Sequence, residues 1–241
     1  MVDSRHLLLW MVSVFPNAAL AATLDVSSPE VEAKKLSLDY RTGVDFADDE
    51  NQETIDEYLH LDYGINDMLA VRVSGSGRKR GNADMEYNAT KWDARFQLFE
   101  NETADFDGAV RFSYQLADGD DKPDTASLAW LASHQVKEFT LTYNAILSHA
   151  LGAESEDGLR GDFRWQALAP LPDTNMRLGL EGFHNVGYLN DIGAFRSQQH
   201  RLGLVLKGKL TDRTAFQLGY LQGISEAAPD HAMKLFLSWV F

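Results

Sequence analysis

The sequence predicts an all-β protein, an up-and-down antiparallel transmembrane β-barrel of twelve strands. Apolar side chains recur at every second position through most of the chain, which is the period of a strand with two unlike faces. Short and long connections alternate between these runs, as tight turns and larger loops do in such barrels. The even strand count places both ends of the barrel wall on the side of the short turns. A count of ten strands would give the same fold class.

The first 22 residues are predicted to form a secretory signal peptide. Arg5 and His6 precede an apolar run over residues 7–15, and Ala19-Leu20-Ala21 follows as a cleavage site with small residues at its first and third positions, which is the order of a cleavable signal. The apolar run is too short to span a bilayer, which takes about 20 residues. A buried N-terminal strand or helix of a cytoplasmic protein is the alternative. We therefore expect a signal peptide at 1–22 and a single barrel domain at 23–241.

Each strand is predicted from its own alternating run. In residues 110–116, for example, Val110, Phe112 and Tyr114 alternate with Arg111 and Ser113. The twelve runs, in chain order, cover residues 36–40, 59–63, 69–73, 92–98, 110–116, 128–130, 139–145, 159–167, 176–181, 202–206, 216–220 and 233–241. No stretch shows the period of an amphipathic helix.

The connections between these runs differ in length in a regular way. Those after the even-numbered runs are short or moderate, at residues 64–67, 101–107, 137–138, 169–175 and 211–213. Those after the odd-numbered runs are polar and mostly longer, at residues 47–54, 74–84, 118–124, 152–157, 184–199 and 223–230. This alternation is typical of a barrel with short turns at its periplasmic end and larger external loops.

The composition excludes several function classes. The 241 residues include no cysteine, so disulfide scaffolds and thiolate metal sites are excluded. The formal net charge of −14 argues against nucleic acid as a partner, because the phosphate backbone favours basic surfaces. No Walker, dinucleotide-binding or His-rich metal motif is present, so no cofactor or metal is expected. A mean hydropathy of −0.29 is typical of a barrel in which only alternate strand residues contact lipid.

The C-terminal run ends on an aromatic residue and is apolar at every second position before it. Its apolar positions are Leu235, Leu237, Trp239 and Phe241. Together with the signal peptide and the alternating strands, this end resembles the Gram-negative outer-membrane β-barrel proteins. The resemblance implies an outer-membrane location after signal cleavage, contact with membrane lipid and lipopolysaccharide, and recognition of these four residues by the barrel-assembly machinery. It names no subfamily.

A soluble periplasmic β-barrel or sandwich, with the apolar face turned inward, is the main structural alternative. About eight strands enclose an interior that side chains can fill, so twelve strands with an apolar lumen would leave a void. The opposite face also carries arginines in mid-strand, such as Arg111. Aromatic residues lie near the short-turn ends, where an interfacial girdle is expected; they are Tyr63, Phe139, Trp239 and Phe241. The membrane barrel is therefore the prediction.

If the apolar face contacts lipid, the polar face lines the lumen, and its charges are predominantly basic. The predicted lumen cations are Arg41, Arg72, Lys91, Arg95, Arg111, Arg160, Arg164, Arg177, Lys207 and Lys234. The predicted lumen acids are Asp39, Asp62, Asp93, Asp162 and Glu181. Most other acids fall in loops, whereas Arg78, Lys79 and Arg80 form a basic cluster in the second long loop. That cluster is expected either to contact lipopolysaccharide phosphates or to be solvated.

A net basic lumen favours a small porin-like channel for anionic or polar solutes, because Arg and Lys side chains in a low-dielectric wall attract and select anions. Arg72, Arg111 and Arg177 have the least obvious partners in their own strands. Alternatively, the sequences around Asp93 and Asp162 form a cross-strand lattice of opposite charges that fills a narrow barrel. A closed structural or adhesion barrel stays open as a third possibility.

A lipid hydrolase is the enzymatic alternative, with a serine activated by a histidine near the membrane surface. The candidates are Ser148–His149, Ser133–His134 and His184–Asn185. None shows the His-x-Ser-Asn pattern of the barrel phospholipases, and adjacent strand residues point to opposite faces. His60, at a lumen position, is interpreted as an interior residue and not as a base. We therefore predict no enzymatic activity.

Overall fold

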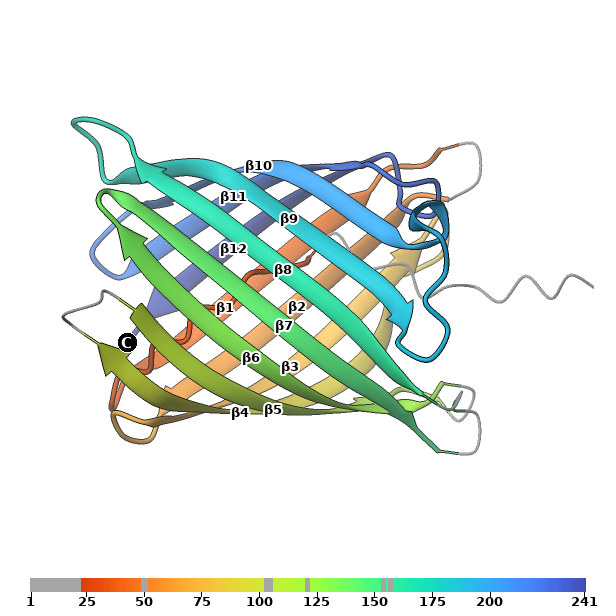
Figure 1. Ribbon diagram of the computed structural model, residues 1–241, viewed down its shortest axis with the longest axis horizontal. Helices are drawn as coiled ribbons and strands as arrows, with labels where there is room; N and C mark the ends of the chain where they lie inside the picture. Colours follow the sequence, from red (N-terminus) through yellow and green to blue (C-terminus); the bar gives the residue numbers. More distant parts are fainter. Residues whose placement is uncertain (1–22, 49–51, 102–105, 120–121, 153–154, 156–157) are drawn as a thin grey trace, which may run out of the picture.

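The computed structural model describes residues 23–241 apart from 49–51, 102–105, 120–121, 153–154 and 156–157 (Figure 1). The predicted signal peptide lies outside the described residues. Twelve strands follow one another: β1 (Leu36–Asp45), β2 (Thr54–Gly64), β3 (Leu69–Arg80), β4 (Glu86–Asn101), β5 (Phe106–Ala117), β6 (Asp124–Val136), β7 (Phe139–Leu151), β8 (Leu159–Pro170), β9 (Met176–Tyr188), β10 (Gln199–Lys209), β11 (Thr214–Gly223) and β12 (His231–Val240). A single turn of 3₁₀ helix, η1 (Phe195–Ser197), lies between β9 and β10. Within the described part of the chain, no helix is long and apolar enough to cross a membrane.

The strands form a closed antiparallel barrel. Each pairs with its neighbours along the chain, and β1 pairs with β12 to close the wall, with Leu38 opposite Trp239. The C-terminus lies with the short turns at one end of the barrel, on the left of Figure 1, and the longer loops lie at the other. The predicted twelve-stranded up-and-down barrel is confirmed.

Most strands are longer than the alternating runs that predicted them. β4, for example, extends from Glu86 to Asn101, whereas its apolar run covers only 92–98. The reason is that apolar alternation marks only the part of a strand that faces an apolar medium, and the hydrogen-bonded ladder continues into polar sequence. The predicted second long loop is therefore too long, since β3 continues to Arg80.

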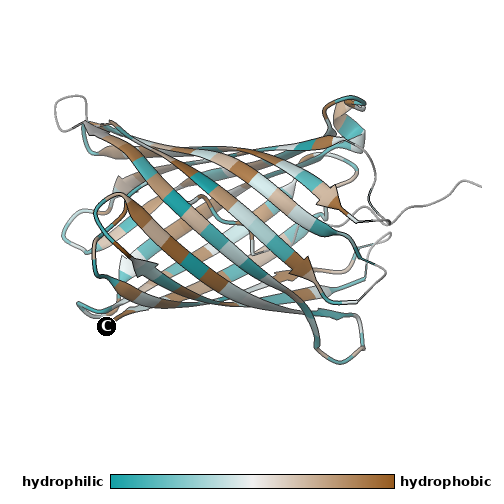
Figure 2. Ribbon diagram, turned by 90° about the horizontal axis from the view of Figure 1, so that it is seen from below, coloured by the Kyte–Doolittle hydropathy of each residue, from teal (hydrophilic) through white to brown (hydrophobic). Residues whose placement is uncertain are grey.

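The barrel wall has an apolar outer side and a mostly polar inner side. Figure 2 shows hydrophobic and hydrophilic residues alternating along the strands. On β10, Leu204 is 55% exposed on the outside, whereas Arg201 and Val205 on the inside are buried. The apolar side chains thus point outward, and the soluble alternative with an apolar interior is wrong.

One side of the interior is apolar. Ala109 on β5, Ala129 and Leu131 on β6 and Ile146 on β7 form a buried cluster on the inward positions of their strands. These four side chains are small or aliphatic. Of the predicted lumen charges, only Arg111 of β5 lies on these three strands, directly opposite Ala129.

The N-terminal segment, defined here as residues 23–35, runs inside the barrel and forms no strand (red in Figure 1). Leu24 and Val26 are buried and belong to one apolar cluster with Phe183, Leu221 and Ala232 of the wall. Near the short turns, the Lys34 N–H donates to the Gly64 carbonyl over 2.7 Å. A Cβ on Gly64 would lie 1.9 Å from the Glu32 carbonyl oxygen, so this close approach requires glycine. No feature of the sequence predicted this segment's position.

Candidate channel lumen

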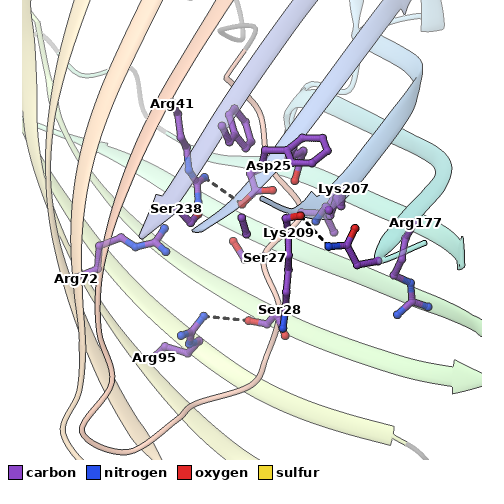
Figure 3. Close-up of a pocket in the computed structure, with 17 residues that line it drawn as sticks. Asp25, Ser27, Ser28, Arg41, Arg72, Arg95, Arg177, Lys207, Lys209 and Ser238 are labelled. Atoms are coloured by element: carbon purple, nitrogen blue, oxygen red, sulfur yellow. Dashed lines mark hydrogen bonds and ion pairs between the residues drawn. The ribbon is translucent and has the colours of Figure 1, made fainter. Parts of the chain in front are cut away.

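A cavity of about 440 Å³ lies inside the barrel, in the half near the short turns (Figure 3). The charged residues that line it are six bases and one acid, and we call this site the basic cavity. Its bases are Arg41, Arg72, Arg95, Arg177, Lys207 and Lys209. Its acid is Asp25 of the N-terminal segment. A net positive charge therefore surrounds free volume inside the wall.

Strand register brings these cations together from distant parts of the sequence. Arg177 on β9 is directly opposite Lys207 on β10, and Arg95 on β4 is opposite Arg111 on β5. Residues directly opposite in an antiparallel pair lie on the same face of the sheet. Like charges therefore lie side by side at two places on the inner wall, which is destabilising unless another group compensates for them.

The cations on the β1–β5 side are largely paired with acids. Arg72 Nε lies 2.7 Å from Asp62 Oδ1, and Arg72 Nη2 lies 3.8 Å from Asp39 Oδ2. Asp93 likewise lies 3.3 Å from Lys91 Nζ and 4.0 Å from Arg111 Nε. Arg72 and Arg111, which have no obvious partner in their own strands, thus find acids on neighbouring strands. The lack of an obvious partner in their own strands therefore does not leave these two cations without an acid nearby.

The cations on the β8–β10 side have a different environment. Within the described residues, Arg160, Arg164, Arg177 and Lys207 form no ion pair. Arg177 Nη2 instead donates to Thr140 Oγ1 over 2.6 Å and to the Glu138 carbonyl over 3.2 Å. The expected charge lattice around Asp162 is therefore not formed; Asp162 accepts a hydrogen bond from Asn185. No carboxylate of the described residues therefore lies within ion-pair distance of these four cations.

A fully buried ion pair joins β9 and β12. Lys234 Nζ lies 2.7 Å from Glu181 Oε1, and both side chains are 0% exposed. Lys234 also donates to the Leu24 carbonyl over 2.7 Å, and Gln166 donates to the other oxygen of Glu181. This pair ties the N-terminal segment to the wall.

Toward the longer loops, the structure adds inward charges that the sequence analysis missed. Arg201 Nη1 lies 2.6 Å from Asp45 Oδ1, and Arg78 Nε lies 2.6 Å from Asp56 Oδ1. Arg78 was expected in a loop, in contact with lipopolysaccharide or solvent, and this prediction is wrong because the residue belongs to β3. Their inward orientation could have been predicted only by continuing the two-residue alternation of strand faces into the polar ends of the strands.

The fifteen predicted lumen residues all lie on strands, at positions that alternate with outward apolar side chains. The predicted assembly residues lie on the outward positions of β12, with Phe241 just beyond its end. The Phe241 N–H donates to the Leu36 carbonyl over 3.0 Å, and its side chain is 71% exposed. Recognition by the assembly machinery stays a prediction.

The serine–histidine candidates are not arranged for nucleophilic catalysis. Ser148 is opposite Ser127 and His149 is opposite Ala126, so the two adjacent side chains point to opposite faces. The Ser133 hydroxyl lies 3.4 Å from Thr142 Oγ1.

Two other histidines, His184 and His60, make contacts that account for their positions in the structure. His184 contacts His200 and accepts from the Trp165 indole. His60 Nδ1 lies 2.6 Å from Ser74 Oγ, but its Nε2 has no hydrogen-bond partner among the described residues. The third group that orients a catalytic base is thus missing at His60.

No protein-family model and no curated protein matches the sequence. Solved structures do match. The KdgM porin aligns with a TM-score of 0.60 and 10% identity over 85% of this chain and 99% of its own. The COG4313 outer membrane channel from Pseudomonas putida F1 aligns with a TM-score of 0.67 and 10% identity over 90% of this chain and 100% of its own.

A structure of the KdgM porin in complex with disordered oligogalacturonate also aligns, with a TM-score of 0.61 and 9% identity over 85% of this chain and 99% of its own. Identities this low establish similarity of fold and nothing finer. Three observations point to the same fold: the closed wall of twelve antiparallel strands, its apolar exterior and the similarity to these three structures. The chain has the fold of the outer-membrane β-barrels.

Proposed function

We propose that this protein is a small porin-like channel of the Gram-negative outer membrane, with a net basic lumen for anionic or polar solutes. The observation that carries the proposal is the basic cavity, in which six bases and one acid surround about 440 Å³. Two adjacent cations of this cavity, Arg177 and Lys207, form no ion pair among the described residues. The porin and channel named among the structural neighbours support the same function.

The physical reason is the dielectric contrast between lumen and wall. Charges in a narrow aqueous path within a low-dielectric wall focus the electric field and raise the local concentration of counter-ions. Rings of Arg and Lys select anions in this way. The ion-paired cations on β1–β5 contribute little net field. The cavity cations without an ion pair among the described residues are therefore expected to dominate the selectivity; they are Arg95, Arg177, Lys207 and Lys209.

A closed structural barrel is the second candidate, and one observation favours it: the N-terminal segment occupies part of the lumen. A closed barrel would give no conductance in a planar bilayer. The contacts described above do not favour lipid hydrolysis.

The double variant Arg177→Gln, Lys207→Gln is expected to lower the ratio of chloride to potassium permeability several-fold, because it removes two adjacent cavity cations that form no ion pair among the described residues. The measurement is the reversal potential of channels in a planar bilayer under a salt gradient. Lys137→Asn is the matched control, since Lys137 lies exposed in a short turn at the same end of the barrel and has a φ of 57° that asparagine tolerates. An unchanged ratio in the double variant would contradict the proposal.

A further inference from the structure

The N-terminal segment fills the lumen without joining the sheet. Residues 23–35 contain no strand, and wall side chains hold the segment at separate points. Asn144 accepts from the Ser27 N–H and donates to the Ser27 carbonyl, over 2.8 and 2.9 Å. Gln97 accepts from the Val31 N–H over 2.6 Å. Removing residues 23–31 would therefore break side-chain contacts but leave every strand pair intact.

The charged residue of the segment within the basic cavity is Asp25. Its Oδ2 lies 3.0 Å from Arg41 Nη1, and Arg41 also lies 3.5 Å from Asp39. Lys207 and Lys234 act on the Asp25 carboxylate electrostatically from β10 and β12. Figure 3 shows Asp25 between Arg41 on one side and Lys207 on the other. The carboxylate thus occupies a position that is built from cations of separate strands.

We infer that Asp25 occupies a binding position for a carboxylate group of the permeating solute, and that the N-terminal segment is a plug that such solutes displace. This inference rests on the proposed channel function. The carboxylate of Asp25 and that of a solute would compete for Arg41 and Lys207, because the strongest hydrogen bonds of these cations go to anionic oxygens. Arg177 lines the same cavity without a carboxylate partner among the described residues. A solute with more than one carboxylate could therefore make a contact that the plug does not make.

The predicted signal cleavage would leave the plug as a free chain end, which can withdraw without opening a loop. Its inner part is held by apolar burial of Leu24 and Val26 and by the hydrogen bond from Lys234 to the Leu24 carbonyl. A ligand shifts such an equilibrium only by binding the displaced state more tightly. The carboxylate position supplies that difference, since it is accessible to solute only when Asp25 has left.

The first test uses single-channel recording of the full barrel. Asp25→Asn is expected to raise the open probability several-fold in chloride solution, because the neutral amide loses the ion pair with Arg41. Glu32→Gln is the matched control, since Glu32 lies on the same segment but is exposed, and its one ion pair among the described residues is with Lys35 over 2.5 Å. Citrate is expected to raise the open probability of the wild type several-fold over chloride at equal ionic strength, and to have little effect on Asp25→Asn. Equal open probabilities in wild type and Asp25→Asn would overturn the inference.

The second test does not depend on conductance. Because the chain has no cysteine, Val26→Cys introduces a single thiol at a position that is 4% exposed. Its labelling by a water-soluble thiol reagent is expected to be slow in chloride and several-fold faster in citrate. Glu32→Cys, at an exposed position of the same segment, should label rapidly in both solutions. Equal labelling rates of Val26→Cys in the two solutions would overturn the inference.

Deletion of residues 23–31 separates this inference from the proposed function. In one outcome the deletion variant conducts with anion preference, but Asp25→Asn has the open probability of the wild type and Val26→Cys labels equally fast in chloride and citrate. The channel function then stands, and the inference of a displaceable plug is wrong. If the deletion variant inserts into bilayers but shows no anion preference, the proposed function fails, and this inference fails with it.

Discussion

Replacing Lys234 by methionine is expected to lower the free energy of unfolding by about 3–5 kcal/mol, which is the usual cost of breaking a buried ion pair. The substitution leaves the Glu181 carboxylate fully buried without its cationic partner. It also removes the hydrogen bond to the Leu24 carbonyl and the contact of Lys234 with the Phe183 ring, 4.6 Å away. The measurement is reversible urea unfolding of the barrel in lipid vesicles.

The double variant Lys234→Met, Glu181→Gln separates the charge effect from a packing effect. Glutamine at 181 can still accept a hydrogen bond from Gln166, and it leaves no buried charge, so most of the lost stability should return. If the double variant is as unstable as Lys234→Met alone, the lost stability arises from packing. The explanation by an unpaired buried carboxylate at Glu181 is then wrong.

Leu204→Arg is expected to destabilise the barrel by about 2–4 kcal/mol, the cost of a basic side chain on the lipid face near the bilayer midplane. Leu204 lies in the middle of β10 and points outward. Leu189→Arg is the matched control, because Leu189 is also exposed but lies beyond the end of β9, outside the strands. Its expected cost is about 0–1 kcal/mol. Equal costs at the two positions would contradict the assignment of the outer wall to lipid.

The recurrence of apolar side chains at every second position predicted the fold, because one face of each strand contacts lipid and the other faces the lumen. The alternation of Leu202, Leu204 and Leu206 with Gly203 and Val205 indicated the strand. The strand count and the mid-strand arginines of the opposite face indicated that the leucine face points outward. Because a one-residue slip would exchange the two faces of a strand, the same pattern also placed Lys207 inward. The strand ends were less predictable, since polar residues such as Arg78 no longer alternate with apolar ones.

The pairing of the inward charges could not be predicted from the sequence, because it depends on which strand positions are opposite one another. Arg72 has no acid next to it in its own strand, yet the β2–β3 register places it opposite Asp62. Arg160 and Arg164 flank Asp162 in sequence, yet neither forms an ion pair within the described residues. Sequence proximity along a strand was therefore an uneven guide to ionic contacts, since Lys91 does pair with Asp93 on β4.

The N-terminal segment was missed for a different reason. Its apolar residues, Leu24 and Val26, are too few to show a period, and nothing in the sequence distinguishes them from a short linker before the first strand. Their burial depends on Phe183 and Leu221, which lie far along the chain. Consequently, the sequence predicted the wall of the barrel but not the occupant of its lumen.

The most direct test of the two-faced wall with a basic interior compares adjacent single cysteines on β11. Gln217 lines the basic cavity and Leu218 points outward. In lipid vesicles, Gln217→Cys should react several-fold faster with an anionic methanethiosulfonate than with a cationic one, because the cavity attracts anions. Leu218→Cys should react slowly with both, because it lies against lipid. Faster reaction of Gln217→Cys with the cationic reagent, or rapid reaction of Leu218→Cys with either, would contradict the account.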